Sequence, residues 1–520
     1  MNYSSVKLFS SCLQALVRAF LLSALVAAYL TSTKASTIQA VKNNPQESLI
    51  IDSTLTLLLA PDEPQAVEAA AEDLQSDFAK VLGNKPEIVR SADAAGPVTI
   101  WIGEISKLPE RMRPVGLSKP ESFSISTTQG QRKSHAGRIV LLAGADLRGT
   151  IYAIYQFSEE YLGVDPLYYW TDHEPPRRAR IELRASLNKQ SPAPVFKYRG
   201  FFINDEDLLT GWAPGEAKDH TGISLQVWNK IFETILRLKG NIVAPGTWIF
   251  PDEPQIQLAG KRGLILTQHH AIPLGLNVAR WPKDVPYSYT SHAEILERAW
   301  KHAAAAYPPG QEVLWTVGLR GLSDASYANF DPSVRGNDKA LGELVTKAIA
   351  DQVQIVRSLR PDAEFITSLW QEGARLVQQG YLNIPPEVAT VWADTGYGYL
   401  QDKGLVTSGQ GAYYHVAMMN GRANQLSEMV PVDRIHSEFG RLYQGWSHSL
   451  FASQYQRHSP GSHDHQSGHG RRLEGLAPGP RRRKRPVLQT MVFRGIWSQG
   501  RCQGGGSLQG IFCCPGSFAG

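Results

Sequence analysis

Residues 197–207 read Lys-Tyr-Arg-Gly-Phe-Phe-Ile-Asn-Asp-Glu-Asp, an apolar run that ends in polar and acidic residues. The run from Tyr198 to Ile203 has the length and aromatic content of a buried strand. Six further short apolar runs follow, at 241–244, 263–266, 314–319, 364–369, 388–392 and 411–414. Helical patterns occur between them, at 224–239, 292–306, 339–360 and about 373–379. Seven such repeats over residues 195–442 predict a parallel (β/α)8 barrel that lacks its last strand.

Polar or aromatic side chains come directly after almost every one of these runs. The residues are Asn204, Asp205, Trp248, His270, Arg320, Asp324, Trp370, Glu372, Asp394 and His415, with Tyr413 in the last run. In a (β/α)8 barrel the carboxyl ends of the strands build the active site. These side chains are therefore expected to converge on one pocket.

Carboxylates and aromatic rings without a cluster of metal ligands suit glycoside hydrolysis. One carboxylic acid protonates the leaving oxygen, while a second carboxylate activates water or attacks directly. Trp248 and Trp370 could stack on sugar rings. The guanidinium of Arg320 suits a carboxylate on the substrate, through paired charge-assisted hydrogen bonds.

Each of these residues also has a purely structural interpretation. The acids at 205–207 could lie in a solvated loop or cap a helix. Glu372 could begin a helix, and Arg320 could simply pair with Asp324. His269 and His270 are adjacent, so they do not share a helix face, and no third ligand is close in sequence. No metal site is predicted from that pair.

Composition excludes several classes of protein. The chain has 520 residues, 42% hydrophobic and 19% charged, which is ordinary globular composition rather than that of a fibrous or disordered protein. The whole chain has a formal net charge of +5. Residues 443–520 contain ten Lys or Arg and two acids, a net charge of +8, so the other 442 residues carry 5 − 8 = −3. This charge gives no support for nucleic-acid binding. Residues 13–501 contain no cysteine, which excludes disulfides and cysteine-based metal sites there.

Residues 1–35 have the pattern of a secretory signal peptide. Lys7 and Arg18 precede an apolar run at 19–30, and small residues follow up to Ala35. The alternative is an uncleaved anchor, but the run is short for a membrane span. We therefore expect a secreted, extracellular protein without a membrane segment after cleavage.

Residues 45–175 predict a small α/β domain. A strand at 48–59, a helix at 65–82 that stops at Gly83, strands at 98–103 and 138–144, and a helix at 147–161 make up the pattern. No paired acids or phosphate-binding loop stand out, so a supporting role is expected. A Pro-, Arg- and Ser-rich joint at 175–194 separates this domain from the barrel.

The chain resembles glycoside hydrolase family 115, the α-glucuronidases that remove (4-O-methyl)glucuronic acid from xylan side chains. The resemblance covers roughly residues 45–442. The matching stretches are residues 147–152 (LRGTIY), 197–206 (KYRGFFINDE), 237–241 (RLKGN), 268–270 (QHH), 317–321 (VGLRG), 370–372 (WQE), 391–394 (VWAD) and 412–415 (AYYH).

The resemblance implies an inverting hydrolase that acts on glucuronoxylan or its oligosaccharides without a metal or organic cofactor. Eight residues match positions around the sugar: Asn204, Asp205, His270, Arg320, Asp324, Glu372, Tyr413 and His415. Glu372 with Asp324 or Asp205 is the expected acid/base set, and Arg320 is expected near the uronate. Residues 395–398 (TGYG) depart from the acidic and amide-rich stretch expected there, which puts the substrate preference in question.

The composition changes from about Leu442 to Arg, Gly, Ser, His and Pro without apolar periodicity. If each codon boundary of Tyr443–His458 moves forward by one base, allowed codons spell IKAGATHFLLVNTSDI, a helix end, an apolar strand and a polar tip. We therefore predict a frameshift near codon 442, with residues 443–520 as a disordered, out-of-frame tail. A barrel open at its last strand would expose unpaired edges, which predicts an insoluble or inactive product. A non-catalytic carbohydrate-binding relative, an inactive truncated product and a hydrolase for another terminal sugar are the competing interpretations.

Overall fold

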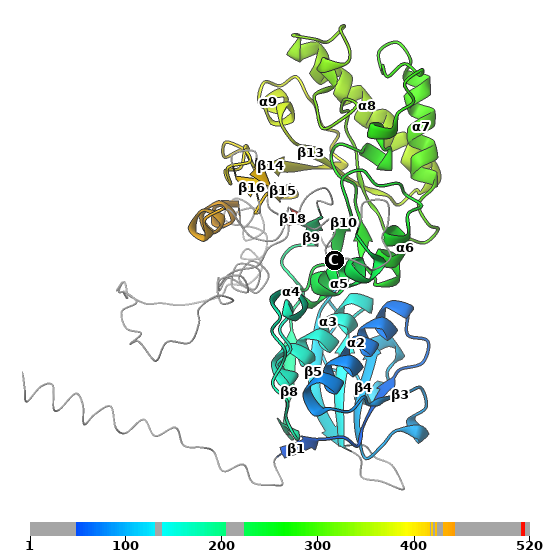
Figure 1. The fold of residues 1–520 in the computed structure, drawn as a ribbon, viewed down its shortest axis with the longest axis vertical. Helices are drawn as coiled ribbons and strands as arrows, with labels where there is room; N and C mark the ends of the chain where they lie inside the picture. The colour runs from blue at the N-terminus through cyan, green and yellow to red at the C-terminus, as the bar shows by residue number, and fades with distance from the viewer. Residues whose placement is uncertain are drawn as a thin grey trace, which may run out of the picture. The chain divides into compact units, whose positions relative to one another are not determined.

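The computed structural model describes residues 48–129, 138–203, 223–416, 418–419, 422–423, 430–442 and 511–514. Seven strands overlap the seven predicted apolar runs, and Figure 1 labels β9, β10, β13, β14 and β15 among them. They are β9 (Tyr198–Phe202), β10 (Ile242–Ala244), β11 (Ile265–Leu266), β12 (Leu314–Thr316), β13 (Glu364–Leu369), β14 (Val388–Ala393) and β15 (Gly411–Tyr414). Two short strands, β16 (Met418–Met419) and β17 (Arg422–Ala423), pair with each other beyond β15.

The sheet that contains β9 to β15, named here the barrel sheet, has the order β11-β10-β9-β18-β15-β14-β13-β12. Every pair among β9 to β15 that is adjacent in this order is parallel. β18 (Ile511–Cys514) lies between β9 and β15 and is antiparallel to both. A single parallel bridge joins Leu266 of β11 to Val313, next to β12.

β18 changes the expectation of a strand position left empty. The position between β9 and β15 is occupied by four residues of the segment predicted to be a disordered tail. An eighth parallel strand is not among the described residues. The remainder of 443–520 lies outside the described residues, and the frameshift stays a prediction.

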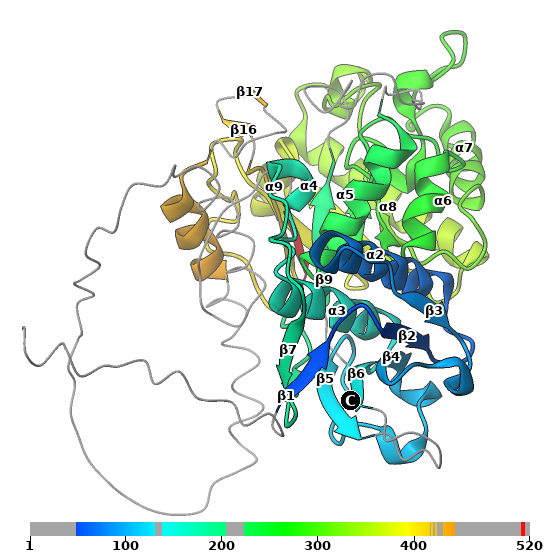
Figure 2. The same ribbon diagram turned by 60° about the horizontal axis from the view of Figure 1, so that its bottom comes forward.

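Helices follow most of the barrel strands. They are α5 (Leu225–Arg237), α6 (Pro254–Lys261), α7 (Ala293–Ala305), α8 (Asp338–Leu359) and α9 (Glu372–Gln378), and residues 432–442 are also helical. α5 and α6 lie side by side, as do α7 and α8 (Figure 2). The sequence pattern predicted α5, α7, α8 and α9 to within two residues at each end, but not α6 or the helix at 432–442.

Gly200 allows β9 to approach β10 closely. Gly200 lies opposite Ile242 of β10, and a Cβ atom added to Gly200 would lie 1.7 Å from the Ile242 carbonyl oxygen. Alternate residues of the strands point inward and form the core, among them Phe202 of β9 and Tyr413 of β15. This alternation follows from strand geometry, because successive side chains of a strand point to opposite faces of the sheet.

A second sheet, named here the N-terminal sheet, has the order β3-β2-β4-β6-β5-β8. Its strands are β2 (Leu55–Leu59), β3 (Glu87–Val89), β4 (Val98–Glu104), β5 (Phe123–Gln129), β6 (Arg138–Gly144) and β8 (Asn188–Ser191). β1 (Ser48–Ile51) and β7 (Ile181–Arg184) lie outside it. The single strand predicted at 48–59 is therefore two strands, because Asp52 accepts the backbone N–H of Thr54 in a turn between them.

Helices α2 (Gln65–Leu82), α3 (Leu147–Phe157) and α4 (Tyr168–Thr171) belong to the same part of the chain. α2 ends at Gly83 as predicted, because Gly83 adopts the left-handed conformation with φ 83° and donates to Ala79. α2 and α3 pack on the N-terminal sheet, and α3 also contacts α5 (Figure 1).

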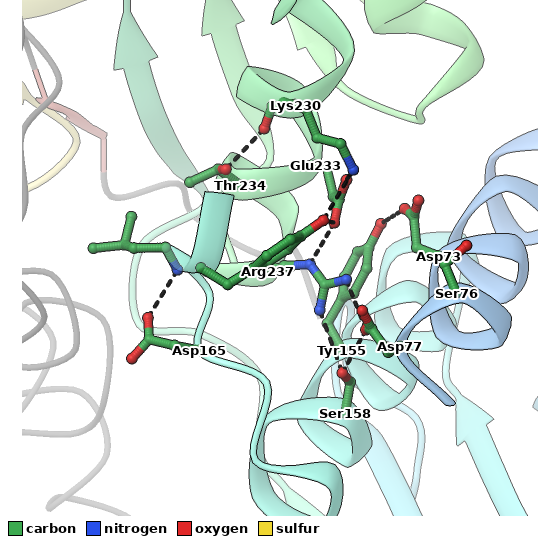
Figure 3. Close-up of polar contacts among 12 residues, drawn as sticks. Asp73, Ser76, Asp77, Tyr155, Ser158, Asp165, Lys230, Glu233, Thr234 and Arg237 are labelled. Carbon is green, nitrogen blue, oxygen red and sulfur yellow. Dashed lines mark hydrogen bonds and ion pairs between the residues drawn. The ribbon is translucent and has the colours of Figure 1, made fainter. Parts of the chain in front are cut away.

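Side chains of α2 and α5 meet in a buried cluster of charges (Figure 3). Arg237 of α5 donates to Asp77 of α2 and to Glu233, each at 2.7 Å, and all three side chains are at most 2% exposed. Ser158 also donates to Asp77, at 2.6 Å. Burial raises the pKa of Glu233, but Arg237 and Lys230 outweigh burial and lower it to about 2.

Two more arginines of the barrel part bind groups of the N-terminal part. Arg199 of β9 contacts Glu121 at 2.6 Å and donates to the hydroxyl of Tyr152 at 3.0 Å. Arg262 forms an ion pair with Asp73 of α2. The described residues from 50 onward form one unit by their contacts. None of the helices in the described ranges is long and apolar enough to cross a membrane.

Candidate active site

The carboxyl ends of β11, β12 and β13 bring five of the predicted side chains into one hydrogen-bonded cluster. These residues are His270, Arg320, Asp324, Trp370 and Glu372. His270 follows β11, Arg320 and Asp324 follow β12, and the other two follow β13. The prediction that these strand ends converge is therefore supported by direct contacts.

Asp324 accepts hydrogen bonds from three different side chains. His270 Nε2 and Arg320 Nη2 lie 3.0 and 3.1 Å from its Oδ1, and Trp370 Nε1 lies 3.0 Å from its Oδ2. Burial raises the pKa of Asp324, but His270 and Arg320 outweigh burial and hold the pKa well below its usual range. Asp324 is therefore an ionised carboxylate at neutral pH, and its side chain is still 36% exposed.

Arg320 holds both carboxylates at once. Its Nη1 donates to Glu372 at 3.0 Å and its Nη2 donates to Asp324. The Arg320 side chain is 8% exposed and that of Glu372 is 14% exposed. Tyr287 fixes the backbone by donating to the Arg320 carbonyl oxygen at 2.5 Å. The Nε atom of Arg320 is buried and has no hydrogen-bond partner within the described part of the chain.

Gln371 connects the two strand ends through its side chain. Arg320 Nη2 donates to Gln371 Oε1 at 3.2 Å, and Gln371 Nε2 donates to the backbone oxygen of Asp324 at 3.2 Å. The sequence analysis did not select this residue. An uncharged residue between Trp370 and Glu372 carries no chemical signal of its own in the sequence.

Aromatic rings form a wall beside the carboxylates. The ring of Trp370 lies 4.9 Å from that of His415 and 5.4 Å from that of His270. Tyr413 lies 4.5 Å from His415 and 5.8 Å from His270. The predicted residues Tyr413 and His415 therefore belong to the same cluster as the acids.

Asp394 contacts this group of rings through His415 and is fully buried, at 0% exposure. Its carboxylate accepts the Nδ1–H of His415 at 2.5 Å and three backbone N–H groups, those of Gly396, Gly398 and His415. Four donors occupy the lone pairs of a carboxylate. Asp394 was expected among the strand-end side chains that converge on the substrate pocket, and its burial contradicts direct contact with a substrate. Its carboxylate instead orients His415.

His269 is a buried neighbour that the sequence analysis did not assign to the site. Its ring stacks on Phe202 at 4.4 Å and lies 3.8 Å from that of His270. Burial lowers the pKa of both histidines, that of His269 well below its usual value. Both imidazoles are therefore neutral at neutral pH. Across the described ranges, no group of three or more His, Cys, Asp or Glu side chains could hold a metal.

Two predicted features of the site have other outcomes. Trp248 is partly buried, and its backbone oxygen accepts a hydrogen bond from Asn277, but no ring contact joins it to the cluster of described side chains. Asn204 and Asp205 lie outside the described residues. The structural interpretations of Glu372 and Arg320 also hold, because Glu372 begins α9 and Arg320 pairs with Asp324.

Two carboxylates held by one arginine, beside aromatic rings at the carboxyl ends of parallel strands, form the kind of site found in glycoside hydrolases. The model of glycosyl hydrolase family 115 matches residues 191–451, which is half of the chain. The chain therefore belongs to glycosyl hydrolase family 115, and the resemblance inferred from the sequence is confirmed.

Solved structures support the fold. The structure is similar to that of BtGH115A, described as a family GH115 4-O-methyl-α-glucuronidase with specificity for decorated arabinogalactans (TM-score 0.65, 23% identity). The match covers 76% of this chain and 54% of that one, so the chain spans about half the length of this relative. A β-hexosaminidase mutant of Streptomyces plicatus has a TM-score of 0.42 at 10% identity over 67% of this chain and 66% of that one, which is too low to support an argument. No match was found among curated proteins.

Proposed function

We propose that this chain is an α-glucuronidase that releases (4-O-methyl-)α-D-glucuronic acid from xylan side chains by an inverting, two-carboxylate mechanism. The observation that carries the proposal is the Arg320 guanidinium, which holds Asp324 and Glu372 together at the strand ends. An inverting hydrolase needs such a pair, one acid for the leaving oxygen and one base for the attacking water.

The surroundings of the two carboxylates differ, and this difference suggests their roles. Asp324 accepts from three side chains and is ionised, so it has no proton to give at neutral pH. In the proposed mechanism Asp324 takes a proton from the water that attacks the anomeric carbon. Glu372 is then the general acid: it takes up a proton from solvent before the reaction and gives that proton to the glycosidic oxygen as that bond breaks. Asp205 is the alternative base.

Other side chains of the cluster are suited to bind the sugar. The ring of Trp370 is only partly buried and offers a face to a uronic acid, and we include Tyr413, His415, His270, Trp248 and Asn204 in the proposed binding set. Arg320 remains the candidate for the uronate carboxylate, because it is the cation that lies between the two proposed catalytic acids at the strand ends. Asp394 acts through His415 in this scheme.

The proposal includes no metal or organic cofactor, because acid/base chemistry by two carboxylates does not require one. We also propose that the protein is secreted, since residues 1–35 have the pattern of a signal peptide. Decorated arabinogalactan is a second candidate substrate, because it is the glycan named for the structural neighbour BtGH115A.

The test is the release of sugar from glucuronoxylan oligosaccharides and from decorated arabinogalactan by the full chain and by Glu372→Gln. Loss of the acid should lower kcat by about 10²–10⁴-fold. Glu343→Gln, an exposed change on α8, is the control and should keep the wild-type rate. Release of neutral sugar instead of uronate would refute the proposed activity. No turnover by the chain as written agrees with the predicted frameshift, so no turnover by a frame-corrected protein as well is the result that would refute the activity. Proton NMR of the first product tests inversion, because an inverting enzyme releases the β anomer.

A further inference from the structure

The backbone at Gln371 has a conformation that glutamine rarely adopts. Its φ is 51° and its ψ is −114°, and the N–H of Gly373 donates to the carbonyl of Trp370 at 3.1 Å. These angles are close to the first central position of a type II′ turn, about 60° and −120°, where glycine is strongly preferred. A side chain at this position strains the backbone. Gln371 is exposed, so packing in the core does not explain why this position carries a side chain instead of glycine.

The side chain of Gln371 accounts for the residue better than the turn does. Its oxygen accepts from Arg320 and its amide donates to the backbone oxygen of Asp324, so both ends of the amide are used. Arginine can only donate and a carbonyl can only accept, which fixes the orientation of the amide. The amide thus links the chain after β12 to the chain after β13.

The turn aims its two neighbours at the same target. Trp370, before Gln371, donates to Asp324, and Glu372, after it, accepts from Arg320. Three consecutive residues therefore contact the Arg320–Asp324 pair from one turn. A rotation of this turn would move Glu372 away from Arg320 and change its position relative to Asp324.

From this geometry we infer that Gln371 is a positioning residue, which fixes the orientation of Arg320 and thereby the spacing of Asp324 and Glu372. The inference rests on the proposed hydrolase function of the same site. Misplacement of a catalytic group by about 1 Å can cost 10²-fold in rate. Loss of the amide should therefore lower kcat by a larger factor than it raises KM, which also rises because Arg320 is the proposed contact of the uronate.

The experiment compares Gln371→Gly and Gln371→Ala with the wild type in the full chain. Glycine relieves the backbone strain and removes the amide, whereas alanine removes the amide and keeps the strain. Both variants should lose about 10- to 100-fold in kcat on glucuronoxylan oligosaccharides, with a smaller rise in KM. The midpoint of chemical denaturation should rise for glycine and stay or fall for alanine. Lys403→Gly is the matched control, because Lys403 is exposed with φ 48°; it should gain stability and keep the wild-type kcat.

A wild-type kcat in Gln371→Gly would overturn the inference. A parallel loss of kcat and stability in this variant would also overturn it, because it would show a merely structural role. If neither the wild type nor a frame-corrected protein releases sugar, the proposed function fails, and crystal structures of the wild type and Gln371→Gly then decide the inference alone. Unchanged bonds from Arg320 to Asp324 and Glu372 in the variant would refute it, and loss of either bond would support it.

Discussion

Removal of the Arg237 guanidinium tests how the buried charges between α2 and α5 contribute to stability. Removing one partner of a buried ion pair typically costs about 3–5 kcal/mol, because it leaves a buried charge without compensation. Two carboxylates lose a partner in Arg237→Met. Glu233 keeps Lys230 at 2.7 Å, and Asp77 keeps Ser158 at 2.6 Å. We therefore expect the lower end of the range, a loss of about 3 kcal/mol in the free energy of unfolding.

The assay is guanidinium denaturation followed by tryptophan fluorescence, with Arg90→Met as the matched control. Arg90 pairs with Glu68 at 2.5 Å, but these side chains are 49% and 38% exposed, so the control should lose at most about 1 kcal/mol. A triple variant, Asp77→Leu with Glu233→Leu and Arg237→Met, removes the charges together and should regain most of the stability. Equal losses in Arg237→Met and Arg90→Met would refute the reasoning.

Three further predictions concern the barrel sheet and the histidines. Gly200→Ala places a methyl group against the Ile242 carbonyl and should lower the free energy of unfolding, measured by chemical denaturation, by at least about 1–3 kcal/mol. The control is Gly440→Ala, which adds its methyl group to a helix where the space is open, and it should be neutral or stabilising. Burial lowers the pKa values of His269 and His270 in the folded state, so the unfolded chain binds more protons. Stability is therefore lost as the pH falls below about 6.5, at up to about 1.4 kcal/mol per pH unit for each histidine. Denaturation at several pH values should show this slope and His269→Phe should halve it, whereas a flat profile would contradict the prediction. Truncation after Gly510 removes β18 and leaves the facing edges of β9 and β15 unpaired. Size-exclusion chromatography should then show more aggregate than for the full chain. An unchanged elution profile would count against a role for β18 in protecting these edges.

The strands of the barrel sheet could be predicted because each is a short apolar run followed by polar residues. β13 and β15 coincide with their predicted runs. β8 reads Asn-Lys-Gln-Ser, so no apolar pattern marks it as a strand. It could not be predicted because its strand conformation depends on pairing with β5. β18 could not be predicted because its partners lie about 100 and 300 residues away in the sequence. Sequencing of the genomic DNA across codons 435–460 tests the frameshift that remains predicted there.

Several members of the candidate site could be predicted from the sequence, but their orientation could not. The positions of Arg320, Asp324 and Glu372 at strand ends were sufficient to bring them together. Whether a residue faces the pocket depends on the turn that carries it. Asp394 turns back toward the N–H groups of its own loop, and Gln371 gains its contacts from a turn that glutamine rarely adopts.

The three arginines that join the barrel part to the N-terminal part limit how modular this protein can be. Arg199, Arg237 and Arg262 each find an acidic partner in the N-terminal part. A catalytic fragment cut at the Pro-rich joint would keep these cations and lose those three acids. Exchange of the N-terminal part between homologues therefore requires that the acids be exchanged with it, and the barrel part is not a transferable unit for enzyme engineering.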